Sequence, residues 1–134
     1  MTTETPAAPL PIDLEQLDDG MLQRLRTKAD DILEARCEAA LPAHVLDDVR
    51  AALADDTDAA PPVSVEFTTR EYDNGHYWNE TAAKVTLADG STREVDLRRT
   101  VADDTLTDHA SWAEPYDDST LTVTFEPLAF HVEY

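Results

Sequence analysis

The hydrophobic period of this chain changes once, near residue 60, and this change constrains the fold more than any other feature. Before it, apolar residues recur every three or four positions, as in an amphipathic helix; after it, they alternate with polar residues, as in a half-buried strand. The segment Ala59-Ala60-Pro61-Pro62 separates the two patterns. A helical first part followed by a β second part predicts an α+β domain.

Two helices are expected in the first part, at about 19–40 and 42–54. Asp18 is the expected N-cap of the first, because an aspartate side chain accepts hydrogen bonds from the free amides of the first turn. Its apolar stripe consists of Leu22, Leu25, Ala29, Ile32, Leu33 and Cys37. Pro42 suits the first turn of a helix better than its interior, so a second helix is predicted to begin there. We interpret the pair as an N-terminal helical hairpin packed on one face of a four-stranded antiparallel sheet.

Four antiparallel strands are expected in the second part. They lie at about 63–72, 77–88, 91–99 and 120–134. A long acidic connection, 102–118, precedes the last strand and has a short helix near 106–113. The apolar parity of the last strand changes at Pro127, which predicts a bulge or bend. Residues 1–12 are predicted to be a flexible proline-rich arm, and residues 13–134 a single domain.

The register of the first three strands follows from their turns, which contain Gly75 and Gly90. Three-residue loops that end on these glycines, both at positive φ, keep the apolar residues of neighbouring strands on one face. In that register, Ala83 faces Val65 on one side and Val95 on the other. A slip by one residue would turn each apolar set to solvent.

The charge of the chain excludes several kinds of partner. It has 29 Asp and Glu against 10 Lys and Arg, a formal net charge of −19. Nucleic acids and anionic membranes are bound through Lys and Arg, so direct binding to either is not expected. A partner attracted by this field is cationic. Because no apolar run is long enough for a membrane span and no signal-peptide pattern is present, the protein is expected to be soluble and cytoplasmic.

Residue patterns typical of catalysis or cofactor binding are absent. The three glycines are too far apart for a dinucleotide or phosphate loop, and Cys37, the single cysteine, is expected to be a small core residue. Asp104, Asp108 and His109 lie close together without the spacing of a zinc or calcium site. Ser111 lies near His109 but outside a nucleophile elbow. We therefore predict no enzymatic activity, no metal and no other cofactor.

Acidic residues are least compensated at the C-terminal end, because no Lys or Arg follows Arg99. A surface of one sign flanked by aromatic side chains would imitate a row of phosphates for a basic groove. The expected partner-binding residues are Asp103, Asp104, Asp108, Trp112, Glu114, Tyr116, Asp117 and Asp118. A second candidate contact is an aromatic turn, because Tyr and Trp are preferred interface anchors. Its residues are Tyr72, His76, Tyr77 and Trp78. The alternative is that these aromatic residues clamp the hairpin and cap the core.

Two hypotheses on function follow. The first is a small, acidic, non-enzymatic binding or inhibitor protein that docks on a basic partner, with nucleic-acid-binding proteins and nucleases as the favoured class. Phage-encoded DNA mimics, anti-CRISPR proteins and immunity proteins resemble it in charge and size alone, and a phage-encoded protein would act in the host cytoplasm. The alternative is a structural or accessory protein, viral sources included, whose acidity is an adaptation to salt. A self-associating module that forms a homodimer through a free sheet edge is one form of this alternative.

Overall fold

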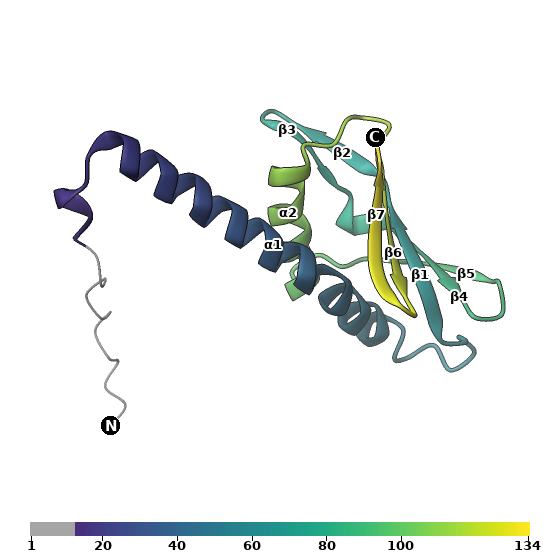
Figure 1. Cartoon of the computed structure of the whole chain (residues 1–134). Coiled ribbons are helices and arrows are strands. Elements are labelled where there is room, and N and C mark those ends of the chain that lie inside the picture. The colour runs from purple at the N-terminus through teal and green to yellow at the C-terminus, as the bar shows by residue number, and fades with distance from the viewer. Residues whose placement is uncertain (1–12) are drawn as a thin grey trace, which may run out of the picture. The chain divides into compact units, whose positions relative to one another are not determined.

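The computed structural model describes residues 13–134, which divide into two units, residues 13–33 and 34–134. The predicted arm, 1–12, lies outside the described residues. The elements in chain order are η1 (Leu14–Gln16), α1 (Asp19–Ala52), β1 (Pro62–Phe67), β2 (Thr69–Tyr72), β3 (Gly75–Trp78), η2 (Glu80–Ala82), β4 (Ala83–Leu87), β5 (Thr92–Val95), α2 (Val101–Ala113), β6 (Thr120–Phe125) and β7 (Leu128–Glu133) (Figure 1). The class is α+β, as the change of period predicted.

The first unit, described from residue 13, contains η1 and the first turns of α1. Asp18 Oδ1 accepts a hydrogen bond from the Met21 N–H at 2.8 Å, so the predicted N-cap is confirmed. No side chain between residues 13 and 33 is buried. Leu22, Ile32 and Leu33 of the predicted stripe are 36%, 40% and 51% exposed. The period identified the helix correctly, but a period alone does not say what covers its apolar side.

Helix α1 continues through Pro42, so the predicted helical hairpin is wrong. A proline inside a helix costs about 3 kcal/mol, because it lacks an N–H and its ring meets the carbonyl of the preceding turn. Leu41 and Pro42 are both buried, and so are Val45 and Val49 in the following turns. Each buried aliphatic side chain contributes about 1.5–3 kcal/mol. Keeping both sides of Pro42 in one helix therefore outweighs the cost of the proline.

The β part has a five-stranded sheet in the order β5-β4-β1-β6-β7 and a separate two-stranded sheet, β2-β3. The predicted four-stranded sheet is therefore wrong in strand number, whereas antiparallel pairing is confirmed. The predicted strand 63–72 is divided into β1 and β2, and 77–88 into β3 and β4. The chain leaves the main sheet at Thr68, and the Asn79 N–H donates to the Thr68 carbonyl at 2.8 Å where it returns.

The predicted register is right for one strand pair and wrong for another. Ala83 pairs with Val95, and Gly90 has a φ of 86°, both as expected from the loop between β4 and β5. Val65 pairs with Val85 rather than with Ala83. That prediction treated a single loop as the connection between the two strands. Because the β2-β3 hairpin and η2 lie between β1 and β4, that loop does not set their register.

The parity change at Pro127 marks a hairpin turn rather than a bulge within a single strand. β6 and β7 pair antiparallel, and Phe125 and Leu128 are the pair next to the turn. The Glu126–Pro127 peptide bond is cis and lies in this turn, where a proline removes no ladder hydrogen bond. Because the turn has two residues, odd positions of β6 face even positions of β7, which accounts for the change of parity.

The core of the second unit lies on one face of the five-stranded sheet, where α1 and α2 cover it. The sheet contributes fully buried side chains such as Val85 and Val123, α1 contributes Val45, and α2 contributes Leu106. Trp78 of β3 is the largest buried side chain, at 1% exposure. The coarse prediction of an N-terminal helix packed against an antiparallel sheet is therefore confirmed.

Candidate partner-binding face

Helix α2 carries several residues of the predicted partner-binding set, and reciprocal capping fixes where it begins. The Thr100 hydroxyl accepts from the Asp103 N–H at 3.1 Å, and Asp103 Oδ2 accepts from the Arg99 N–H at 2.9 Å. These bonds satisfy backbone donors that a helix start leaves free. The helix predicted near 106–113 therefore begins earlier, at Val101, and ends at Ala113 before Pro115.

The helical period of α2 separates its apolar side from its acidic side. Ala102, Leu106 and Ala110 are at most 2% exposed and belong to the core. The opposite side is acidic, and because no Lys or Arg follows Arg99, no basic residue of this part of the chain neutralises it. We call this side the α2 acidic face, and it consists of Asp103, Asp104, Asp108 and the C-cap residue Glu114. Asp103 is partly buried and the other three are exposed.

The segment after α2 presents Tyr116, Asp117 and Asp118, which we call the acidic loop. The buried Ser119 hydroxyl accepts from the Tyr116 N–H at 2.8 Å, and the Asp117 carbonyl accepts from the Thr69 hydroxyl of β2 at 2.8 Å. Tyr116 also packs edge-on against Tyr134, with ring centroids 6.1 Å apart. The loop is thus held to strand β2, so a partner would meet a preorganised surface.

The aromatic turn is a two-residue connection between β2 and β3. Gly75 has the predicted positive φ, 134°, but it pairs with Tyr72, so the three-residue loop predicted here is wrong. Tyr72 and Tyr77 meet edge-on with ring centroids 5.4 Å apart, as a clamp of the hairpin would. Tyr72 is 45% exposed, whereas Trp78 is buried and is not available as a surface contact. Trp78 is therefore removed from the candidate surface.

The structure brings the two predicted contact sets together, because β3 packs against α2. Figure 1 shows α2 standing beside the β2-β3 hairpin. Asn74 and Tyr77 lie between two hollows, one towards the end of α2 and one towards its start, and the Asn74 amide donates to the Tyr77 hydroxyl at 2.9 Å. Trp112, the remaining aromatic residue of the first set, is only partly exposed. Sequence reasoning had treated the acidic and aromatic residues as separate surfaces.

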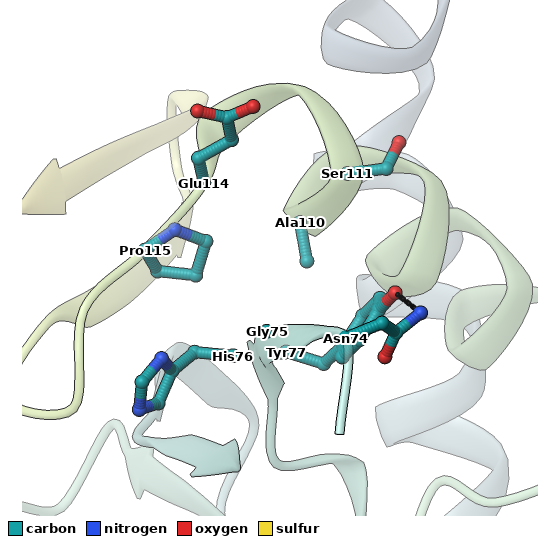
Figure 2. Close-up of a pocket in the computed structure, with 8 residues that line it drawn as sticks. All are labelled: Asn74, Gly75, His76, Tyr77, Ala110, Ser111, Glu114 and Pro115. Carbon is teal, nitrogen blue, oxygen red and sulfur yellow. Dashed lines mark hydrogen bonds between the residues drawn. The ribbon is translucent and has the colours of Figure 1, made fainter. Parts of the chain in front are cut away.

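The hollow towards the end of α2 has a volume of about 330 Å³ (Figure 2). Its polar side chains do not converge, because the Glu114 carboxylate, the Ser111 hydroxyl and the His76 ring all point away from its centre. The Ser111 hydroxyl donates to the Asp108 carbonyl at 2.6 Å. The space between them is bounded by Ala110, Pro115 and the hairpin backbone. A nucleophile and a base within reach of one another are not assembled here.

His109, considered in the sequence with two aspartates, belongs to the core instead. It is 4% exposed, and its Nδ1 accepts a hydrogen bond from the Trp78 Nε1–H at 3.0 Å. Its ring also meets Phe130 edge-on, with centroids 5.1 Å apart. Burial lowers the pKa of His109 below its ordinary value, because an apolar environment disfavours the charged imidazolium. His109 is therefore a neutral hydrogen-bond acceptor.

Cys37 lies where α1 meets α2. Its thiol donates to the Thr105 carbonyl at 3.6 Å, and the neighbouring His44 Nδ1 lies 2.8 Å from the Thr105 hydroxyl. Burial, with smaller contributions from nearby carboxylates, raises the pKa of the Cys37 thiol to about 11. Because the thiolate is the reactive form, this cysteine is unreactive near neutral pH.

Two further findings concern the described part of the chain. Within residues 13–134, no three His, Cys, Asp or Glu side chains are grouped so that they could hold a metal ion. None of the helices described there combines the length and apolar content needed to cross a membrane. Comparisons of this chain with protein-family models, curated proteins and solved structures gave no match.

Proposed function

We propose that this protein is a small, non-enzymatic binding protein that docks on a basic protein in the cytoplasm. Its contact surface consists of the α2 acidic face and the acidic loop, with the exposed Tyr72 and the partly buried Tyr77 of the β2-β3 hairpin beside them. The favoured partner is a nucleic-acid-binding protein or nuclease, whose basic groove the carboxylates would occupy in place of phosphates.

One observation carries this proposal: carboxylates, all exposed except the partly buried Asp103, follow one another along α2 and the acidic loop, and no Lys or Arg lies among them in the sequence. Elsewhere in the second unit, acids are partly neutralised in place. The Arg93 Nε lies 2.8 Å from Asp56 Oδ2, and the Arg98 Nη2 lies 2.7 Å from Asp96 Oδ2. The uncompensated surface is thus local, and its field would steer and orient a cationic partner.

A charge-matched pair of variants separates this proposal from an effect of total charge. The first variant replaces five acids of the proposed surface by Asn: Asp103, Asp104, Asp108, Asp117 and Asp118. The second replaces five exposed acids elsewhere: Asp30, Asp31, Asp47, Asp55 and Asp58. Both variants and the unchanged protein are immobilised and exposed to cell lysate at about 50 mM KCl, where electrostatic attraction is weakly screened. Bound proteins are eluted with a short DNA duplex.

We expect the unchanged protein and the second variant to retain the same basic protein, and the first variant to lose it. Duplex DNA should release that protein, because both ligands would occupy one groove. Raising KCl to about 200 mM should weaken the complex at least about tenfold, as long-range attraction is screened. The proposal would be contradicted if both variants lost the captured protein equally, or if neither DNA nor salt released the bound protein.

A further inference from the structure

The hollow towards the start of α2 lies between the β2-β3 hairpin, η2 and α2, and it has a volume of about 290 Å³. Its lining consists of Tyr72, Asn74, Tyr77, Glu80, Asp103 and Thr107. Pockets that take whole small-molecule ligands measure about 300–1,000 Å³. At the lower end of this range, the hollow has room for one side chain of a partner.

The lining combines aromatic rings with carboxylates and has no cationic side chain. The rings of Tyr72 and Tyr77 lie nearly perpendicular, at 79°, so they present both a ring face and a ring edge. The Glu80 side chain is only 15% exposed, and Asp103 is partly buried. Ring faces and partly desolvated carboxylates both attract cations. Aspartate and glutamate in the same hollow would repel an anionic group.

The chain itself shows that a guanidinium fits this environment. The Cζ of Arg70 lies 5.8 Å from the centroid of the Tyr72 ring, within the range of a cation–π contact. Its Nη1 lies 3.9 Å from Glu80 Oε1, well beyond the 2.7–2.9 Å or so of a charge-assisted hydrogen bond. Arg70 is 47% exposed and does not line the hollow. Glu80 thus retains capacity for a closer cationic partner.

We infer that this hollow, the tyrosine–carboxylate pocket, binds an arginine side chain of the basic partner. The guanidinium would stack on the Tyr72 ring and donate hydrogen bonds to the carboxylates of Glu80 and Asp103. Arginine suits this lining better than lysine, because its planar group can stack on a ring and bond to a carboxylate at the same time. The inference rests on the proposed function and specifies which partner residue the surface recognises.

The probe for this inference is N-acetyl-arginine methylamide, added to the isotope-labelled full chain while backbone amide resonances are recorded by NMR. We expect saturable shifts that centre on Tyr72, Tyr77 and Thr107. The citrulline analogue has nearly the same shape without the charge and should give no saturable shift. The lysine analogue should bind more weakly than the arginine probe, because an ammonium cannot stack as a planar group.

Three variants test the lining, and one serves as control. Tyr72→Leu removes an exposed ring and should weaken probe binding about threefold, the value of an exposed cation–π contact. Asp103→Asn keeps an acceptor for the Arg99 N–H, and Glu80→Gln keeps the side-chain shape, so each removes charge with little change to the fold. Both should weaken binding further. Asp47→Asn removes the same charge from an exposed site on α1 and should leave binding unchanged.

Several results would overturn the pocket. They are shifts that never saturate, shifts spread over all acidic residues, or an Asp47→Asn loss equal to that of Asp103→Asn. The proposed docking function fails separately. If the arginine probe saturates at the pocket but no DNA-displaced protein is captured, the arginine site stands and the docking function falls. If capture succeeds and the probe fails, the docking function stands and the pocket falls.

Discussion

At the scale of single residues, the main result is that the two most conspicuous chemical groups serve packing. Trp78 and His109 form a buried donor–acceptor pair, in which the indole N–H requires an unprotonated imidazole nitrogen. Sequence reasoning left Trp78 open as a surface contact or a cap of the core, and it considered His109 only as a metal ligand, which the spacing did not support. Only the packing of β3 against α2 reveals that both side chains face the core.

The Trp78–His109 pair predicts a loss of stability in mild acid. Folding keeps His109 neutral, whereas the unfolded chain protonates this residue below the ordinary pKa of 6.5. The unfolded state therefore binds more protons below that pH, and the free energy of unfolding falls as pH decreases from about 6.5. Urea titrations at several pH values between 7.5 and 5 would measure this fall in the free energy of unfolding. The carboxyls with lowered pKa values, those of Asp56, Asp89 and Asp96, titrate at lower pH.

The variant His109→Asn isolates this contribution, because its side-chain oxygen can accept the Trp78 N–H without becoming charged. At pH 7.5 we expect the His109→Asn variant to be less stable than the unchanged protein by about 1–3 kcal/mol, because packing is lost. Its free energy of unfolding should, however, vary less with pH. The control variant His131→Gln replaces an exposed histidine. Its free energy of unfolding should fall with decreasing pH as steeply as that of the unchanged protein. If the free energy of unfolding of His109→Asn fell as steeply with decreasing pH as that of the unchanged protein, another group would be the cause of the destabilisation in acid.

At the scale of elements, local rules succeeded where neighbouring residues decide the structure and failed where distant packing decides it. Asp18 and Gly90 were placed correctly, because a helix cap and a tight loop depend on a few adjacent residues. Pro42 was misjudged, since burial on both sides of it keeps α1 continuous. The separate β2-β3 hairpin was missed because nothing in the alternation near Thr68 shows that the chain leaves the sheet.

Replacing Pro42 by Ala tests this explanation of α1. The alanine restores an N–H that can bond to the carbonyl of the preceding turn, which is worth up to about 3 kcal/mol in a helix interior. Loss of the buried ring offsets part of this gain. We expect urea unfolding to show a net stabilisation of about 1–2 kcal/mol. The slope of the free energy of unfolding against urea concentration should not change. A destabilised variant would mean that the proline ring contributes more to the core than to the disturbance of the helix.

The candidate site was predicted in part. The acids of α2 and the acidic loop could be located from the sequence, because their lack of compensating bases is a property of chain order. Their neighbours Glu80 and Asn74 gave no signal, since they reach the same surface only through the packing of the hairpin on α2. The same packing removed Trp78 from the surface.

At the scale of the whole molecule, stability is unevenly distributed. Every buried side chain of α1 lies at or beyond Leu41, and none lies between residues 13 and 33. Deleting residues 1–33 should therefore shift the melting temperature by no more than about 4 °C, measured by circular dichroism. Deleting residues 1–42 also removes Leu41 and should destabilise the fold severely. Strong destabilisation by the shorter deletion would show that the first unit supports the core.

The response to salt separates the proposed function from salt adaptation. A net charge of −19 destabilises the compact state by self-repulsion, so the first increments of KCl should raise the melting temperature. Screening is largely complete near about 0.15 M, where the Debye length is about 8 Å. We expect the melting temperature to level off there. A rise that continues into molar KCl would favour the structural or accessory alternative.

The last residue of the chain has a practical consequence for how binding is measured. The Tyr134 hydroxyl donates to the Ala113 carbonyl at 3.1 Å, and its ring packs on Tyr116 of the acidic loop. An affinity tag or surface linkage attached after Tyr134 would tether the protein next to the surface that a partner has to reach. Capture experiments should therefore anchor the protein through its N-terminal side, because every residue of the proposed contact surface lies at or beyond Tyr72 in the sequence.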